Sequence, residues 1–570
     1  MLQSTGQLDT FSLHDNTTQH TVIRDMLCRR GIVSHQDIER FHTPNYERDI
    51  HDPFLFDDMI TCVGRIMNAI HAREKICIYG DYDVDGICAT VILFETLKAL
   101  GADVMVRINH RDNEGYGLQC HAIDAIKEEC VSLIITTDQG ISNKRETDYA
   151  CALGIDVIVT DHHTVPDDPA NIPLVVGIIH PRVHADRYPF NDLSGGGAAF
   201  KLAQGLIRSQ HPSSIEWRQY EKWLLDLVCI STLADCVPLL DENRAFLHFG
   251  LIVLNKTRRI GLQALLNAVP VHGRTLTPHT ISFYISPLLN AASRMDHALR
   301  SFNLLVAEDG DTAQEIVKLL QGYNRERQKL TTRITREANA QCRMQDDTDR
   351  ILVGSSETWP IGVLGLVAGT LVRTFNKPVV LISEKPDKNV GVARSTFDIH
   401  ITHSFQKIDV LFDRYGGHHR AGGFALKEGV SISEFVQQIN SIDYDSCTVP
   451  DNGQENAPPY DISLSDITLE FADQVARCKP WGYGNLQPSF RIQDCTVTTI
   501  SYVGKKRQHL RLCVEEGGQR RTMIGVKKAK NSGDLSIGDI LTTRCHIDMG
   551  LWNGSRDIFI ELIDYVKRPV

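Results

Sequence analysis

The alternation of short apolar runs with helix-like segments between about residues 75 and 240 most constrains the fold. The runs KICIYG (75–80), VSLIITTDQG (131–140) and IDVIVTDHHT (155–164) have the length of buried strands. The segment GICATVILFETLKALGA (86–102) after the first run has the apolar spacing of a helix. Strands that alternate with helices predict a mainly parallel sheet covered by helices.

The remaining sequence predicts further structural segments. A charged, Pro-free stretch (309–344) is typical of a long spacer helix, and RILVGSS (350–356) begins a second α/β unit. A Pro- and Asn-rich linker precedes a C-terminal part whose apolar and polar residues alternate, as expected for a small β-barrel. The predicted segments are a helical extension 1–70, an α/β domain 71–270, a connecting helical segment 271–345, a second α/β domain 346–445, a linker 446–460 and a barrel domain 461–570.

Acidic and histidine side chains fall where the predicted strands end. The strand-end candidates are Asp81, Asp83 and Asp85 after the first strand, Asp138 after the next, Asp161, His162 and His163 after a third, and Asp235 after a further apolar run. The carboxyl ends of parallel strands meet at one crevice, so we expect these side chains to converge. Residues i, i+2 and i+4 of an extended segment also share a face, which fits the first three acids.

Convergent carboxylates repel one another and stay ionised only around a cation. Carboxylates with neutral imidazoles suit Mn²⁺ or Mg²⁺, and about six such ligands fit two ions roughly 4 Å apart. The expected chemistry is hydrolysis of a phosphoester or phosphoanhydride. Taken singly, each motif also fits a solvated turn or a helix cap, and Asp85 in particular could cap the helix that follows it.

Basic and glycine-rich segments accompany these acids. The glycine run in LSGGGAAFKL (193–202) enters a helix and could present N–H groups to phosphate. The glycine-rich segment RYGGHHRAGGFAL (414–426) permits close backbone approach and adds histidine donors. A turn with a solvated basic residue is the alternative at each place. The candidate substrate-binding residues are Arg111, Asn290, Arg294, Arg394, His418 and His419.

The barrel region is locally basic, although the chain has a net charge of −11. Nine Lys and Arg stand against two acids between Ser501 and Lys530, with Tyr502 and His509 among them. A basic groove with rings that can stack on bases predicts single-strand binding on an OB-type barrel, and a solvated hairpin face is the alternative. The candidates there are Lys505, Lys506, Arg507 and Arg511.

These motifs, in this order, resemble the DHH phosphoesterase superfamily and, within it, the RecJ family of exonucleases specific for single-stranded DNA. YGDYDVDG, TTDQGIS, VTDHH, SGGGAAFKL and STLADCVPL are similar to DHH-domain motifs, and PIGVLGLVAGTLV and RYGGHHRAGGFAL to the DHHA1 domain. PWGYGNLQPSF is similar to the start of the family's OB domain. The resemblance covers almost the whole chain and implies a parallel-sheet DHH domain, a long helix, a smaller α/β DHHA1 domain and an OB-type barrel.

The resemblance also implies residue roles. Asp83, Asp85, Asp138, His162, His163 and Asp235 would be catalytic metal ligands, with Asp81 in or near the shell. Arg111 and Arg294 would contact DNA phosphates, Arg394 would help to hold the 5′ end, and His418 and His419 would belong to the substrate loop. Three positions depart from the family pattern: Pro360 replaces a usual histidine, Val392 a serine and Ser293 a glycine. We expect any effect of these departures to fall on recognition of the 5′ end or on the rate, not on the reaction type.

The resulting hypothesis is a 5′→3′ exonuclease that hydrolyses single-stranded DNA to mononucleotides in repair and recombination, with two Mn²⁺ or Mg²⁺ ions. One alternative is a DHH-type phosphodiesterase for short oligonucleotides or nucleotide bisphosphates, and another is a non-enzymatic DNA-binding scaffold. A single-strand-binding protein or a helicase is a possible protein partner.

The sequence also predicts where the chain works. Its 15 cysteines form no CxxC pair, which is typical of reduced thiols. It shows no signal-peptide pattern and no apolar run long enough to cross a membrane. We therefore expect a cytoplasmic protein without a membrane partner.

Overall fold

The computed structural model describes residues 18–183, 187–211, 213–270, 275–346, 348–385, 388–396, 398–444, 458–552 and 555–568. Contacts divide the chain into two units, which are described separately. The first combines Met1–Asn45, Pro238–Leu240 and Gly453–Val570, and the second combines Tyr46–Val237 and Asp241–Asn452. Among the described helices, none is both long and apolar enough to span a bilayer.

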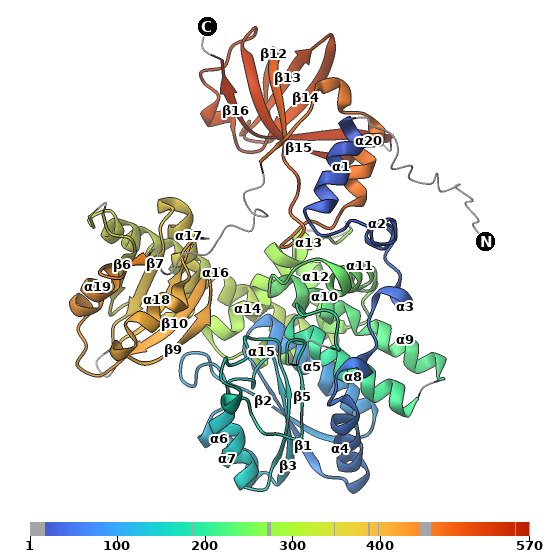
Figure 1. Ribbon diagram of the computed structural model, residues 1–570, viewed down its shortest axis with the longest axis vertical. Helices are drawn as coiled ribbons and strands as arrows, with labels where there is room; N and C mark the ends of the chain where they lie inside the picture. The colour runs from blue at the N-terminus through green and yellow to red at the C-terminus, as the bar shows by residue number, and fades with distance from the viewer. Residues whose placement is uncertain are drawn as a thin grey trace. The chain divides into compact units, whose positions relative to one another are not determined.

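The second unit contains a five-stranded parallel sheet in the order β2-β1-β3-β4-β5 (Figure 1). Its strands are β1 (Lys75–Gly80), β2 (Asp103–Ile108), β3 (Val131–Thr137), β4 (Asp156–Thr160) and β5 (Gly177–Ile179). The central strands are almost wholly buried, because helices cover both faces. Helices α6 (Cys120–Glu128) and α7 (Lys144–Ala152) lie on one side, and α4 (Met59–Ala72), α5 (Val84–Ala99) and α8 (Gly195–Gln210) complete the cover.

Further helices of this unit surround that core. They are α3 (Tyr46–Asp49), η1 (Pro53–Leu55), η2 (Pro169–Asn171), α9 (Ile215–Trp223), α10 (Leu225–Ala234), α11 (Asp241–Leu254), α12 (Ile260–Ala268), α13 (Pro278–Thr280), η3 (Ile281–Ile285), α14 (Ser286–Met295) and α15 (Leu299–Leu305). The predicted spacer helix is α16, which runs unbroken over Gly310–Cys342 and is capped by the Asp309 carboxylate.

A second sheet follows in the order β6-β7-β8-β10-β9. Its strands are β6 (Leu352–Ser356), β7 (Val379–Ser383), β8 (Val390–Arg394), β9 (Phe412–His418) and β10 (Ala421–Leu426), and its helices are α17 (Ile361–Phe375), α18 (Ile401–Lys407), η4 (Asp409–Leu411) and α19 (Ile432–Asn440). Ile334 and Ala338 of α16 share a hydrophobic cluster with α17 and this sheet. Segment 414–426, which was expected to be a loop, instead belongs to the antiparallel β9–β10 hairpin. Its glycines lack Cβ atoms and so let the two strands approach closely.

The first unit contains the β-barrel. Strand order β11-β12-β13-β14-β16-β15 closes through a further β12–β15 pairing. Its elements are α1 (Thr18–Cys28), α2 (His35–His42), β11 (Tyr460–Asp461), η6 (Leu464–Asp466), α20 (Leu469–Arg477), β12 (Phe490–Val503), β13 (His509–Glu516), β14 (Gln519–Gly525), η7 (Ala529–Asn531), β15 (Ile540–Trp552) and β16 (Ser555–Lys567). Ile23 and Phe41 of the N-terminal helices belong to the same hydrophobic core as the barrel strands.

The parallel sheet, the long helix, the second α/β domain and the barrel confirm the predicted fold class. The boundaries of the six predicted segments stay predictions.

Candidate active site

The sequence reasoning assumed that the segment with Asp81, Asp83 and Asp85 is extended. In the structure it turns into a helix instead. Helix α5 begins at Val84, and Asp83 is its N-cap. The Asp83 carboxylate accepts the N–H groups of Asp85 (2.8 Å) and Gly86 (3.1 Å). The cap residue is therefore Asp83 and not Asp85, and the helical turn sends the Asp85 side chain towards α8 and α10.

Asp85 is fixed by a cradle of donors from two other helices. Its carboxylate accepts the N–H groups of Gly195 and Gly196, each at 2.8 Å, and the Ser231 hydroxyl at 2.5 Å. The expectation that this glycine run presents N–H groups to phosphate is therefore wrong for these two residues, because a protein carboxylate already occupies them. A Cβ on Gly196 would collide with Ser231, so glycine is needed for this close approach.

Asp138 and His162 lie at the centre of the site, at the ends of β3 and β4. Asp138 has a left-handed backbone (φ 62°), and its N–H donates to the Thr160 carbonyl oxygen at 3.0 Å. The Nε2 atom of His162 lies 3.1 Å from Asp138 Oδ1, 3.5 Å from Asp235 Oδ2 and 3.8 Å from Asp85 Oδ2. Four side chains from separate segments thus face one small volume.

His163 is oriented by Asp161, which the structure assigns a supporting position. Its Nδ1 lies 2.8 Å from Asp161 Oδ1 and 3.8 Å from Asp138 Oδ1. The fully buried Asp161 carboxylate also accepts the N–H groups of His162 and His163 through Oδ1 and of Ile141 through Oδ2. Burial alone would raise the pKa of Asp161, but His163 holds it well below its usual range.

Three overlapping groups of potential ligand atoms arise from these contacts. Within each group, the atoms lie within 4.8 Å of one another. The groups are Asp138 with His162 and His163, Asp85 with His162 and Asp235, and Asp81 with Asp83 and Asp138. The structure thus brings together all seven predicted ligands, while their metal-binding role stays a prediction.

The electrostatics of these groups fit a divalent cation. Burial, followed by neighbouring carboxylates, raises the pKa of Asp81 to about 7 and of Asp85 to about 6, and raises the pKa values of Asp138 and Asp235 well above their usual range. Asp81 Oδ1 is buried and accepts no hydrogen bond from the described residues. Oxygen-rich sites with imidazole suit Mn²⁺ and Mg²⁺, and a bound cation would relieve the repulsion.

Arginine side chains gather beside the acids. We call Arg111, Arg294 and Arg394 the arginine cluster. Arg111 lies over the Tyr82 ring at 4.8 Å, and Arg294 donates to the Gly362 carbonyl oxygen at 2.6 Å. Burial, with the nearby cations Arg111, Arg327 and Arg394, lowers the pKa of Arg294 to about 9. Cations held this close favour an anionic ligand.

The other predicted substrate-binding residues are placed less directly. The Asn290 Oδ1 atom accepts the Val84 N–H at 3.2 Å and so supports the start of α5. The His419 ring lies 5.1 Å from the His400 ring, and the side chain of His418 lies outside the described part of the structure.

The three departures are accommodated by local packing. Pro360 is the N-cap residue of α17, and Val392 packs against a hydrophobic cluster. Ser293 donates to the Asn290 carbonyl oxygen at 3.2 Å.

The basic residues of the barrel lie on exposed surface. Lys505, Lys506 and Arg507, here called the basic hairpin, form the turn between β12 and β13, and Arg511 is exposed on β13. Tyr502 is 42% exposed next to this turn.

Sequence reasoning placed Asp161 among the converging acids but assigned it no role, and it missed the supporting residue Ser231. Ser231 stands four residues before the predicted ligand Asp235. Residues at this spacing share one face of a helix, so the spacing could have indicated that Ser231 also faces the site.

The chain matches three known families. Residues 75–232 match the DHH family, N-terminal domain, residues 348–442 match the DHHA1 domain, and residues 460–564 match the RecJ OB domain. It is 31% identical over 538 residues to the single-stranded-DNA-specific exonuclease RecJ of Bacillus subtilis, covering 94% of this chain and 66% of that protein. The corresponding protein of Thermus thermophilus is 30% identical over 512 residues, which cover 88% of this chain and 69% of that protein.

Solved structures agree with these matches. A crystal structure of RecJ in complex with Mn²⁺ from Thermus thermophilus has a TM-score of 0.76 at 25% identity, covering 98% of this chain and 77% of that chain. A structure of exonuclease RecJ bound to manganese has a TM-score of 0.58 at 31% identity, covering 70% of this chain and 97% of that chain.

Proposed function

The chain belongs to the RecJ family of single-stranded-DNA-specific exonucleases, and from this premise we propose that it hydrolyses single-stranded DNA from the 5′ end, releasing mononucleotides. The observation that carries the proposal is the cluster of buried and half-buried carboxylates and half-buried imidazoles beside the arginine cluster. The carboxylates and imidazoles suit a divalent cation, and the arginine cluster suits the phosphates of a DNA strand. The family implies work in DNA repair and recombination.

The proposed ligands are Asp81, Asp83, Asp85, Asp138, His162, His163 and Asp235, which would hold two ions of Mn²⁺ or Mg²⁺. Ions bound there supply a water of lowered pKa and neutralise charge on phosphoryl oxygens. The Asp85 cradle and Asp161 orient the ligands before substrate arrives.

The arginine cluster would fix the substrate relative to these ligands. Arg111 and Arg294 would bind strand phosphates, and Arg394 would bind the 5′ end. Guanidinium groups suit this role because they donate two parallel hydrogen bonds to one phosphate. The 5′→3′ polarity rests on the family resemblance.

Timed digestion of end-labelled single- and double-stranded DNA, with Mn²⁺, Mg²⁺ or EDTA, tests this function. We expect metal-dependent release of mononucleotides from the 5′ end of single strands. Asp138→Asn should abolish release, whereas Asp148→Asn, which changes an exposed acid paired with Lys144, should not. Release from the 3′ end would contradict the polarity, and full activity of Asp138→Asn would contradict the metal site.

The alternative function is a phosphodiesterase for short oligonucleotides or nucleotide bisphosphates. The exposed basic hairpin beside Tyr502 favours a longer strand, because a short substrate needs no separate binding domain. Parallel digestion of a long strand and a dinucleotide separates the two functions.

Protein partners and location complete the proposal. A single-strand-binding protein or a helicase would supply the single strand. Because the proposed substrate is cellular DNA, we propose a cytoplasmic location.

A further inference from the structure

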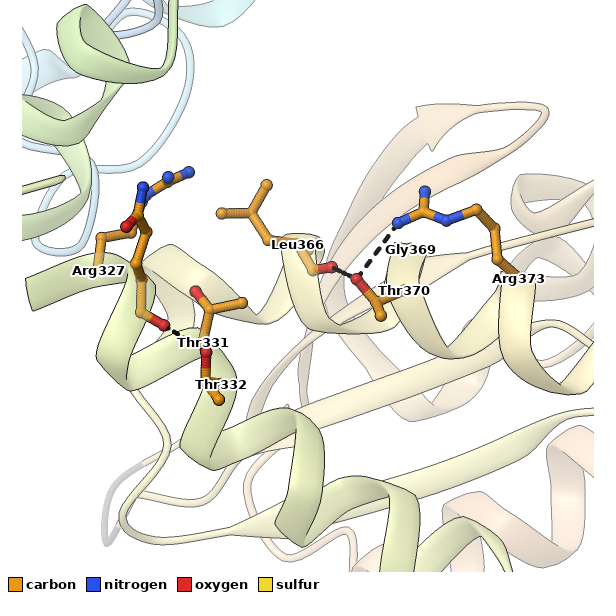
Figure 2. Close-up of a pocket in the computed structure, with 9 residues that line it drawn as sticks. Arg327, Thr331, Thr332, Leu366, Gly369, Thr370 and Arg373 are labelled. Carbon is orange, nitrogen blue, oxygen red and sulfur yellow. Dashed lines mark hydrogen bonds between the residues drawn. The ribbon is translucent and has the colours of Figure 1, made fainter. Parts of the chain in front are cut away.

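A groove of about 530 Å³ lies between α16 and α17, and the reaction described above does not use it (Figure 2). Helix α16 contributes Arg327 and Thr331, and helix α17 contributes Gly365, Gly369 and Arg373. Figure 2 shows Arg327 and Arg373 on opposite sides of this groove. Among the described residues that line it, none is acidic. The groove is therefore cationic without an internal counter-ion.

Polar atoms on the α16 side lack partners. Arg327 Nε and Thr331 Oγ1 are buried and make no hydrogen bond with any residue in the described ranges. On the α17 side, the exposed guanidinium of Arg373 donates a long hydrogen bond of 3.4 Å to the Thr370 hydroxyl. Buried donors are normally satisfied, so Arg327 Nε and Thr331 Oγ1 indicate a ligand that accepts hydrogen bonds.

The groove adjoins the arginine cluster. Arg394 Nη2 lies only 2.9 Å from the position that a Cβ on Gly365 would take, so this glycine leaves room for the arginine. Arg327 is also close enough to Arg294 to lower the pKa of that guanidinium. A line of guanidinium groups thus continues from the acidic site into the groove.

We propose that the α16–α17 groove is a second phosphate-binding site, which holds a phosphate group of the nucleotide chain through Arg327, Thr331 and Arg373. Guanidinium and hydroxyl donors match phosphate oxygens, and glycine at two successive turns of α17 lets the ligand approach the helix backbone. The inference rests on the proposed function, because the metal centre would hold the scissile phosphate.

Two sources could supply this phosphate. It is either a phosphodiester further along the bound strand or an additional phosphate at a 5′-polyphosphate end. A strand phosphodiester and a terminal phosphate present similar oxygens to the groove. Only a comparison of substrates that carry one or the other can show which of them binds.

Opposite charges introduced at one position give the sharpest test. A Cβ on Gly369 would meet nothing within 4 Å, so a side chain can start there without a clash. Gly369→Glu and Gly369→Lys add similar bulk with opposite charge. Arg327→Ala removes a donor from the groove, and Arg325→Ala removes an exposed arginine from another face of the same helix as a control.

The full-length variants are compared by kcat and KM on three substrates with Mn²⁺ present: a long 5′-phosphorylated strand, a 5′-phosphorylated dinucleotide and a dinucleotide with a 5′-triphosphate. We expect KM of the Glu variant to exceed that of the Lys variant about tenfold, with kcat unchanged. Arg327→Ala should lower the magnitude of the salt slope of log kcat/KM by about 0.7, and Arg325→Ala should leave it unchanged. Thermal melting checks that all variants fold.

The substrates identify the source. An effect on the long strand but not on the monophosphate dinucleotide assigns the site to strand phosphodiesters, and an effect confined to the triphosphate assigns it to terminal phosphates. Equal KM values for both Gly369 variants on every substrate, with an active wild type, overturn the groove proposal alone. A wild type that cleaves no strand with metal present overturns the proposed function instead.

Discussion

Replacing Asp161 by Asn tests whether this buried carboxylate organises the metal ligands. Its two oxygens accept hydrogen bonds from the N–H groups of Ile141, His162 and His163 and from the His163 ring. The Asn side chain has nearly the same shape but no charge, and one oxygen becomes an NH₂ group. The NH₂ group of the new side chain then faces at least one of the N–H groups that the carboxylate accepted.

The magnitude follows from these contacts. Hydrogen bonds to a charged group contribute about 1.5–3 kcal/mol each, and an unsatisfied buried donor costs about 1–3 kcal/mol. If the Asn oxygen keeps the histidine contacts, the NH₂ group faces the Ile141 N–H, and we expect a loss of about 3 kcal/mol in unfolding free energy. Because His163 also loses the anion that orients its ring, metal affinity should fall about 10–100-fold.

The assay has two parts. Denaturant unfolding of the whole chain gives the stability change, and nuclease activity titrated with Mn²⁺ gives the apparent metal affinity. Activity of the variant should recover at high Mn²⁺, which a general folding defect would not produce. Asp148→Asn is the matched control, since an exposed ion pair contributes only about 0–1 kcal/mol. An unchanged Mn²⁺ requirement in Asp161→Asn would refute the orienting role.

Three further predictions concern other parts of the chain. Gly196→Ala should lose about 1–3 kcal/mol of stability and most activity, measured by melting and digestion, because its Cβ would collide with Ser231 in the Asp85 cradle. Adding Mn²⁺ at a hundred times its dissociation constant should stabilise the protein by about 2.7 kcal/mol per bound ion over EDTA in calorimetry, and no shift would argue against a metal site. Replacing all three residues of the basic hairpin by alanine should reduce the magnitude of the slope of log binding constant against log salt concentration by about 2, measured for single-stranded DNA in EDTA. An unchanged slope would place the strand elsewhere.

A pH prediction concerns Glu221, which is buried against Tyr46, Gln204 and Arg208. Burial acts to raise its pKa, but the hydrogen bond from Arg208 lowers the pKa below the usual value. A depressed folded-state pKa means that the stabilisation is present above the unfolded pKa of about 4.3 and is lost as pH falls. The stability difference between wild type and Glu221→Gln should therefore be constant near neutral pH and shrink below about pH 4 in denaturant titrations.

Much of the fold was predictable because its signals are local. Period and length separate strands from helices, and acids directly after apolar runs indicate the crevice of a parallel sheet. The approach of Asp138 and His162 follows from that topology, whereas Asp85 lies in the first turn of α5 and Asp235 is the C-cap residue of helix α10, not the end of a strand.

The partners of these acids were not predictable. The glycines that bind Asp85 stand 110 and 111 residues away, and a glycine run at a helix start offers its N–H groups equally to a carboxylate or a phosphate. Likewise, Asp161 neighbours His162 in sequence, but only the structure shows that its side chain faces the Ile141 N–H.

The shared core of the N-terminal helices and the barrel sets an order for synthesis. Helix α1 ends at Cys28, and β16 begins only at Ser555. At about 5–20 residues per second, a ribosome needs roughly 25 to 100 s to cover this distance. Until the barrel strands are made, from Phe490 of β12 onwards, the apolar side chains of Ile23, Met26 and Phe41 lack the strands of their shared core, while the second unit is completed in between. The N-terminal helices therefore cannot complete their core until the barrel strands are made, and their apolar side chains can bind a chaperone in the meantime.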